Sequence, residues 1–126
     1  MKIFRQLSVI GLVLLAVTLS SITHAGTPKT RADGVTVIHL DEYSGYFSAH
    51  ETVAGLKPGK YEFVVTNKSD KLVGFQIQNF KSQETLDMFP LEPGEQRVSK
   101  VTITKDGVRF RCPINPTPWY DLDVIK

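Results

Sequence analysis

Cysteine is almost absent from this chain of 126 residues, which contains only Cys112. A single cysteine excludes an internal disulfide and a Cys-x-x-Cys redox pair. The chain also lacks the usual Ser-His-Asp and Cys-His catalytic motifs and a glycine-rich phosphate loop. We therefore expect no catalytic residues and no enzyme. Cys112 could be free, metal-bound or paired with another molecule, and a buried apolar thiol without a function is the alternative.

An excess of charge of one sign is also missing. The chain has 15 lysine and arginine residues against 13 aspartate and glutamate residues. Lys2 and Arg5 belong to a distinct N-terminal segment, and without them the acidic and basic residues balance. Nucleic acids and anionic membranes are bound by basic patches. We therefore expect neither of them as a partner.

Residues 7–19 form the one long hydrophobic run. It follows Lys2 and Arg5 and precedes Thr23-His24-Ala25, a small-x-small pattern that suits signal peptidase. The run is shorter than the roughly 20 residues that cross a bilayer. We interpret residues 1–25 as a signal peptide and expect a periplasmic or secreted protein with no membrane span after its removal. An uncleaved N-terminal anchor is the alternative.

The rest of the chain divides into a leader and one domain. Residues 26–34 are small, polar or basic and predict a flexible leader. Residues 35–126 contain short alternating stretches separated by turns, a pattern typical of an all-β sandwich. The strands are predicted at residues 35–40, 61–66, 72–80, 96–104, 108–112 and 122–125. One short helix is predicted at residues 82–88, with Ser82 as its cap and Pro90 at its end.

Three segments of this domain resemble the cupredoxins, the superfamily of plastocyanin and azurin. The first is Phe47-Ser48-Ala49-His50-Glu51-Thr52-Val53, and the second is Lys57-Pro58-Gly59-Lys60-Tyr61-Glu62-Phe63 with Asn67 after it. The third runs from Pro93-Gly94-Glu95 through two strands to Cys112. Their order and spacing are similar to the cupredoxin pattern, which implies a Greek-key β-sandwich over residues 35–126.

The same resemblance implies an incomplete copper site. A blue-copper centre uses two imidazoles, one thiolate and a weak axial thioether. The resemblance places these ligands at Val73 or Gly74, Cys112, Asn115 and Tyr120, and only Cys112 can serve. We expect no cofactor, although copper remains a candidate because Cys112 with Met88 could hold Cu(I). His39 and His50 are expected at the surface, away from the metal end.

Large aromatic residues replace the missing ligands. Trp119 and Tyr120 follow Cys112 in a loop that Pro113, Pro116 and Pro118 stiffen. Tyr43 and Tyr46 are expected to approach the same end of the sandwich. Together Tyr43, Tyr46, Trp119 and Tyr120 could form a recognition rim, because tyrosine and tryptophan provide contact area at little entropic cost. Alternatively, Trp119 and Tyr120 fill the space of the metal.

These observations favour an exported cupredoxin-like binding or accessory protein of the cell envelope. The family implies an association with metal handling, and the partner would be an envelope protein or a small ligand. The competing hypothesis is a copper carrier or electron-transfer protein that uses Cys112 with unorthodox ligands. A third possibility is a dimer linked through Cys112.

Overall fold

The computed structural model describes residues 26–122, and this part of the chain forms nine strands and no helix. The signal peptide predicted at residues 1–25 and most of the last predicted strand lie outside the described residues. The strands are β1 (Lys29–Thr30), β2 (Val35–Tyr43), β3 (Tyr46–Ala49), β4 (Gly59–Asn67), β5 (Val73–Asn79), β6 (Thr85–Leu91), β7 (Gln96–Ile103), β8 (Val108–Arg111) and β9 (Tyr120–Leu122). No helix in the described part is long and apolar enough to cross a membrane.

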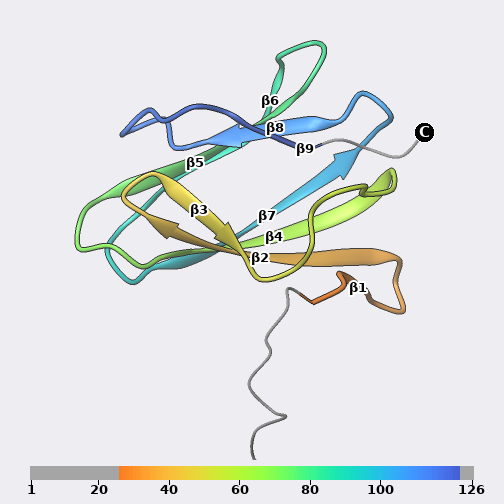
Figure 1. Cartoon of the computed structure of the whole chain (residues 1–126), viewed down its shortest axis with the longest axis horizontal. Coiled ribbons are helices and arrows are strands. Elements are labelled where there is room, and N and C mark those ends of the chain that lie inside the picture. The colour runs from red at the N-terminus through yellow and green to blue at the C-terminus, as the bar shows by residue number, and fades with distance from the viewer. Residues whose placement is uncertain (1–25, 123–126) are drawn as a thin grey trace, which may run out of the picture.

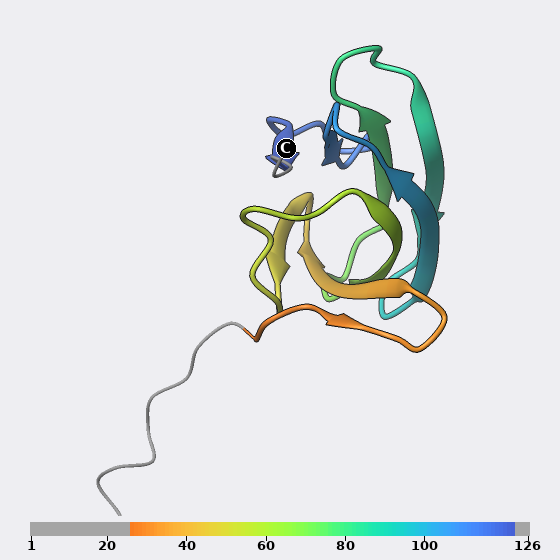
Figure 2. The ribbon, with the colours of Figure 1, turned by 90° about the vertical axis from the view of Figure 1, so that its right-hand side faces the viewer.

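The strands form two sheets that pack face to face (Figures 1 and 2). One sheet has the order β1-β2-β4-β7, with β3 also paired to β2, and the other has the order β6-β5-β8-β9. The pair β2 and β4 is parallel, and the other pairs are antiparallel. The predicted all-β sandwich is therefore confirmed.

Alternation along the strands builds the core between the sheets. In β4, Tyr61, Phe63 and Val65 point inward while Glu62 and Val64 are partly exposed. Phe63 meets Phe75 and Phe110 of the opposite sheet at ring-centroid distances of 6.3 and 6.4 Å. Burying each such ring removes a large apolar surface from water and contributes about 2–3 kcal/mol. This aromatic cluster joins the two sheets across the core.

The helix predicted at residues 82–88 is wrong. The chain turns over residues 79–84, where Gln83 has a φ of 62°, and then enters β6. The Asn79 side chain accepts hydrogen bonds from the Lys81 and Ser82 N–H groups and so stabilises the turn. Pairing with β5 buries Phe89 and Leu91, and this packing outweighs the local helix propensity. Pro90 is tolerated because β6 is an edge strand.

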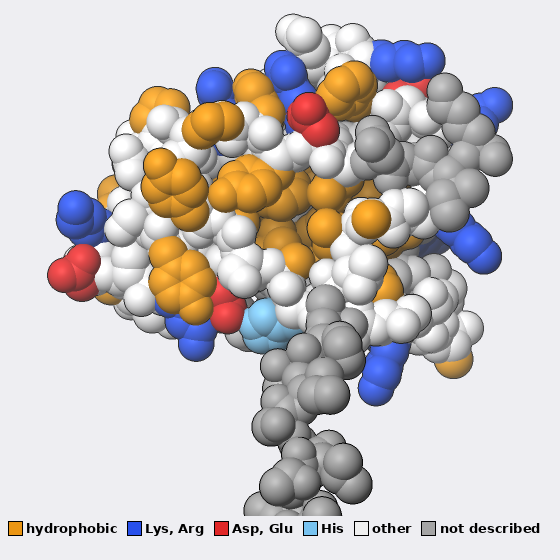
Figure 3. Space-filling model, viewed as in Figure 1, with side chains coloured by type: hydrophobic (Ala, Val, Ile, Leu, Met, Phe, Trp, Pro, Cys, Tyr) orange, Lys and Arg blue, Asp and Glu red, His pale blue; other side chains and the backbone are white. Residues whose placement is uncertain are grey.

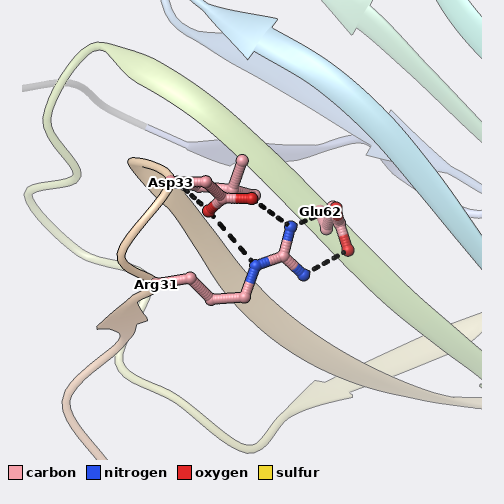
Figure 4. Close-up of polar contacts among 4 residues, drawn as sticks. Arg31, Asp33 and Glu62 are labelled. Carbon is pink, nitrogen blue, oxygen red and sulfur yellow. Dashed lines mark hydrogen bonds and ion pairs between the residues drawn. The ribbon is translucent and has the colours of Figure 1, made fainter.

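The predicted leader, residues 26–34, lies against the sandwich. It contains β1, which pairs with β2. The Arg31 guanidinium bridges Asp33 at 3.1 Å and Glu62 of β4 at 2.8 Å (Figure 4). The hydrogen bond from Arg31 holds the pKa of the exposed Asp33 carboxyl below its usual value. An exposed ion pair stabilises little, so the backbone pairing of β1 is the main attachment.

A buried amide ties the strands together at one end of the sandwich. Asn67 Nδ2 donates to the Lys71 and Leu91 carbonyl oxygens at 2.7 and 3.0 Å, and its Oδ1 accepts from the Ser69 N–H and hydroxyl at 2.9 and 2.6 Å. One side chain thus orders the turn from β4 to β5 and contacts β6.

We expect Asn67→Ala to lower the free energy of unfolding by about 2–4 kcal/mol, because it leaves buried backbone groups without partners. Urea unfolding measures the change. Lys68→Ala, at the exposed neighbouring position, serves as the control and should stay within about 0.5 kcal/mol of the parent. Equal stability of the two variants would contradict the role of Asn67.

Candidate functional site at Cys112 and Glu42

Cys112 lies directly after β8, at the end of the sandwich where Asn67 closes β4. Alternation in β8 turns Val108 and Phe110 inward, and Cys112 continues this inward row. Its side chain is completely buried. The Gly74 and Asn115 N–H groups donate to its Sγ at 3.4 and 3.3 Å. The sulfur is therefore held from two sides as an acceptor, and its own proton is free to point elsewhere.

Gly74 allows the loop after Cys112 to lie close to β5. A Cβ atom at this position would come within 3.1 Å of the Pro113 ring and 3.3 Å of Ile114. Gly74, a position to which the resemblance assigns an imidazole ligand, therefore allows close packing against this loop. Val73, the alternative position, is buried in the core.

Glu42 is a candidate site residue that the sequence analysis did not identify. It follows Ile38 and Leu40 on the inward face of β2 and, like them, is fully buried. Within residues 26–122, neither of its carboxylate oxygens has a hydrogen-bond partner. The signal was present in the strand alternation, because the period of two that buries Ile38 and Leu40 also buries Glu42.

Glu42 and Cys112 lie next to each other. Burial raises the pKa of Glu42 to about 7, because a charged carboxylate is poorly solvated in the core. The Cys112 thiol is close enough to lower that pKa in part, although its geometry falls short of a proper hydrogen bond. The carboxyl and the thiol are therefore neighbours in the buried core.

The hairpin of β2 and β3 is fastened to the loop after Cys112. Asn115 Nδ2 donates to the Ser44 carbonyl at 2.6 Å, and the Thr117 hydroxyl donates to the Gly45 carbonyl at 2.8 Å. Gly45 has a φ of 99°, and a Cβ atom there would lie 2.9 Å from the Asn115 carbonyl oxygen. Only glycine suits both the turn and this close approach.

Tyr120 closes the same end from inside. The Phe47 N–H donates to its hydroxyl oxygen at 3.1 Å. Its ring stacks on Phe110 at 5.2 Å and meets Phe47 edge-on at 5.5 Å. Figure 3 shows hydrophobic side chains gathered in the middle of this face, over the region between β3 and β8. Asn115 and Tyr120, at expected ligand positions, are thus occupied by structural contacts.

The structure places the four residues of the predicted rim on different surfaces. Tyr43 and Tyr46 stand on the hairpin, 50% and 60% exposed. Tyr120 is half-buried behind them, whereas Trp119 lies on the outer face of the second sheet. There the Arg109 and Arg111 guanidinium carbons lie 4.2 and 4.3 Å from its ring centroid. The sequence did not single out Leu72 and Ile114, which are also exposed and flank Gly74 and Cys112.

The other candidate ligands do not reach the thiol. Met88 lies on β6 opposite Gln76 and is 57% exposed, so its side chain points away from the core that holds Cys112. His39 alternates with Leu40 and faces outward, where it bonds Glu51 at 2.7 Å. His50 bonds Asp41 at 2.8 Å on the same outer face. The structure therefore does not bring Met88 and Cys112 together.

The donor set does not fit a blue-copper centre. No group of three or more histidine, cysteine, aspartate and glutamate side chains within residues 26–122 could hold a metal ion. A blue-copper site needs two imidazoles beside the thiolate, and here the neighbour is one carboxyl.

Comparison with known proteins supports the fold and goes no further. No protein-family profile and no curated protein sequence matches the chain. The crystal structure of a multicopper oxidase is similar to this chain at a TM-score of 0.50 and 14% identity. The similarity covers 80% of this chain and 46% of that one, so this chain spans less than half of that protein. The chain is cupredoxin-like in fold.

The Glu42 carboxyl should make stability depend on pH. Its pKa is raised from 4.5 in the unfolded chain to about 7 in the folded protein, so the folded state binds a proton that the unfolded state has released. Stability from this group is complete below about pH 4.5 and is lost as the pH rises through about 7. Between pH 5 and 8 we expect a loss of about 1–3 kcal/mol. Urea unfolding with chelator present measures it.

Glu42→Gln removes the titrating group, so the free energy of unfolding should change less between pH 5 and 8. Glu84→Gln, at an exposed carboxyl, serves as the control and should keep the slope of the parent. Parallel profiles for the parent and Glu42→Gln would show that the carboxyl does not titrate in this range.

The burial of Cys112 predicts a protected thiol. An aromatic disulfide reagent should react at least about 100-fold more slowly with the native chain than with the chain in urea, because reaction requires local opening of several kcal/mol. A disulfide-linked dimer should form equally slowly. Absorbance of the released thiolate measures the rate, and native reaction as fast as in urea would refute the burial.

Proposed function

We propose that this chain is an exported accessory binding protein of the cell envelope that acts beside metal-handling proteins and does not transfer electrons through a blue-copper centre. The contacts of Asn115 and Tyr120 carry the proposal. The resemblance to cupredoxins assigns them to the positions of two copper ligands, and here they hold the hairpin in place. The order of residues 1–25, basic then apolar then small, supports export.

The end of the sandwich around Cys112 suits recognition of another protein. Four apolar side chains are exposed there, from the hairpin and from the loops before β5 and after β8: Tyr43, Tyr46, Leu72 and Ile114. The hydrogen bonds of Asn115 and Thr117 fix the hairpin before any partner arrives. A preorganised surface loses less entropy on binding, and tyrosine is enriched among the residues that dominate binding energy.

A copper carrier is the second candidate function. The buried neighbours Cys112 and Glu42 favour it, because a thiol and a carboxyl are both able to bind metal ions. An electron carrier is less well supported, since no imidazole among the described residues is placed beside the sulfur.

The double variant Tyr43→Ser, Tyr46→Ser should abolish capture of the envelope partner by the immobilised chain. Phe80→Ser is the matched control, because Phe80 is 44% exposed and lies by the turn before β8, where its N–H bonds the Gly107 carbonyl. Quantitative mass spectrometry should find proteins that the parent and Phe80→Ser retain and that the double variant loses at least about tenfold.

Equal capture by all three proteins, or capture by none, would contradict the docking role. Copper gives an independent test of the other half of the proposal. A blue absorption band that disappears on reduction and returns on reoxidation would show that the chain is an electron carrier.

A further inference from the structure

We propose that Arg109, Arg111 and Trp119 form a second contact surface, which binds the carboxylates of an acidic segment in a protein partner. This surface lies on the outer face of the β6-β5-β8-β9 sheet, so the inference goes beyond the proposed function and does not depend on the β2–β3 hairpin. It rests on two observations. Two guanidinium groups gather on one indole ring, and no carboxylate within residues 26–122 forms an ion pair with either of them.

Strand alternation places both arginines on this outer face. Val108 and Phe110 are buried in the core, so Arg109 and Arg111, which alternate with them in β8, point the other way and are partly exposed. Trp119 directly precedes β9, and both guanidinium carbons lie within 4.3 Å of its ring centroid. One ring thus holds two positive charges close together, an arrangement that repels itself unless an anion joins it.

Contact with Trp119 leaves the N–H groups of both arginines available to a partner. A cation–π contact uses the positive charge of a guanidinium and does not use its N–H groups as hydrogen-bond donors. Arg109 Nε donates to Gln78 Oε1 at 3.1 Å, which fixes the direction of that side chain. Arg111 Nε is buried and has no hydrogen-bond partner in the described part of the chain. The fold therefore orients two guanidinium groups without neutralising them.

The neighbouring strands supply little negative charge to this face. Gln76 and Gln78 of β5 lie opposite Arg111 and Arg109, and both are neutral. Asp121 of β9 lies opposite Arg109 and shares its face, yet no ion pair joins these two side chains. Asp121 is thus a competitor for the site, and an external carboxylate has to displace it or bind beside it.

The chemistry of the pair favours protein carboxylates. The planar fork of a guanidinium matches the two oxygens of a carboxylate, and arginine and tryptophan are enriched among the residues that dominate protein interfaces. Nucleic acids and anionic membranes are bound through several basic residues along an extended patch, whereas this surface offers two. Because the indole ring already holds both guanidinium groups, less side-chain entropy is lost when a partner binds. A short run of acidic residues suits such a surface.

The test is a fluorescence titration of the purified chain, because Trp119 is its only tryptophan and reports on this surface directly. The probe is a hexaglutamate peptide at low ionic strength. We expect a saturable change in Trp119 emission and an affinity that falls as salt is added. Arg109→Gln and Arg111→Gln should each weaken binding at least about tenfold, because a hydrogen bond to a charged group contributes more than a neutral one.

Arg97→Gln is the matched control. Arg97 also lies over an aromatic ring, 4.8 Å from the Phe89 centroid, and no second guanidinium among the described residues lies over that ring. Its loss removes the same charge from the chain and leaves the pair intact, so binding should equal that of the parent. Asp121→Asn should strengthen binding about twofold or more, because it removes the competing carboxylate. A gain of this kind cannot come from a damaged fold.

The proposal is overturned by a titration that does not saturate, by binding that survives both Arg109→Gln and Arg111→Gln, or by an equal loss in Arg97→Gln. Inorganic phosphate is titrated in parallel. Phosphate binding as tight as that of the peptide would also overturn it, because the surface would then take a small anion and not a protein segment. Thermal unfolding checks each variant, and Asp121→Asn keeps both arginines, so weaker binding by that variant would contradict the site even if an arginine variant is unstable.

Discussion

The attachment of the β2–β3 hairpin to the loop after Cys112 is the constraint on which this end of the molecule depends. Side-chain hydrogen bonds from Asn115 and Thr117 to the carbonyls of Ser44 and Gly45 hold two segments that lie about 70 residues apart in sequence. The attachment fixes the hairpin beside the loop that follows Cys112, and the hairpin exposes Tyr43 and Tyr46. Strand alternation in β2 and β8 buries Glu42 and Cys112 next to that loop.

The sequence predicted those parts of the fold that follow from local pattern. The alternation over residues 61–66 corresponds to β4, and the strands predicted at residues 96–104 and 108–112 correspond to β7 and β8. The pattern failed at residues 82–88, where Ser82 as a cap and Pro90 as an end suggested a short helix. Tertiary pairing decided that segment, since β6 forms an antiparallel ladder with β5 that has one register shift, between Ile77 and Gln78. Such a ladder cannot be seen in the segment itself.

Only one of the two residues of the candidate site, Cys112, could be predicted from the sequence. Cys112 was identified by the motif that precedes it, whereas Glu42 lies 70 positions earlier in a strand without a motif. Strand alternation placed Glu42 on the buried face, yet alternation alone does not say what faces it. The rim shows the same limit: Tyr43 and Tyr46 reached the expected end, while Trp119 turned outward because two arginine side chains on β8 lie against its ring.

The cost of burying Glu42 connects the site to the stability of the fold. An apolar side chain of similar size would pack there without loss of solvation, so the buried carboxyl lowers the stability of the fold. Protonation reduces the disadvantage, and with a pKa of about 7 the group is poised between its two forms near neutral pH. Unfolding returns the carboxyl to water, where its pKa is 4.5, so protonation and folding are coupled through this one side chain.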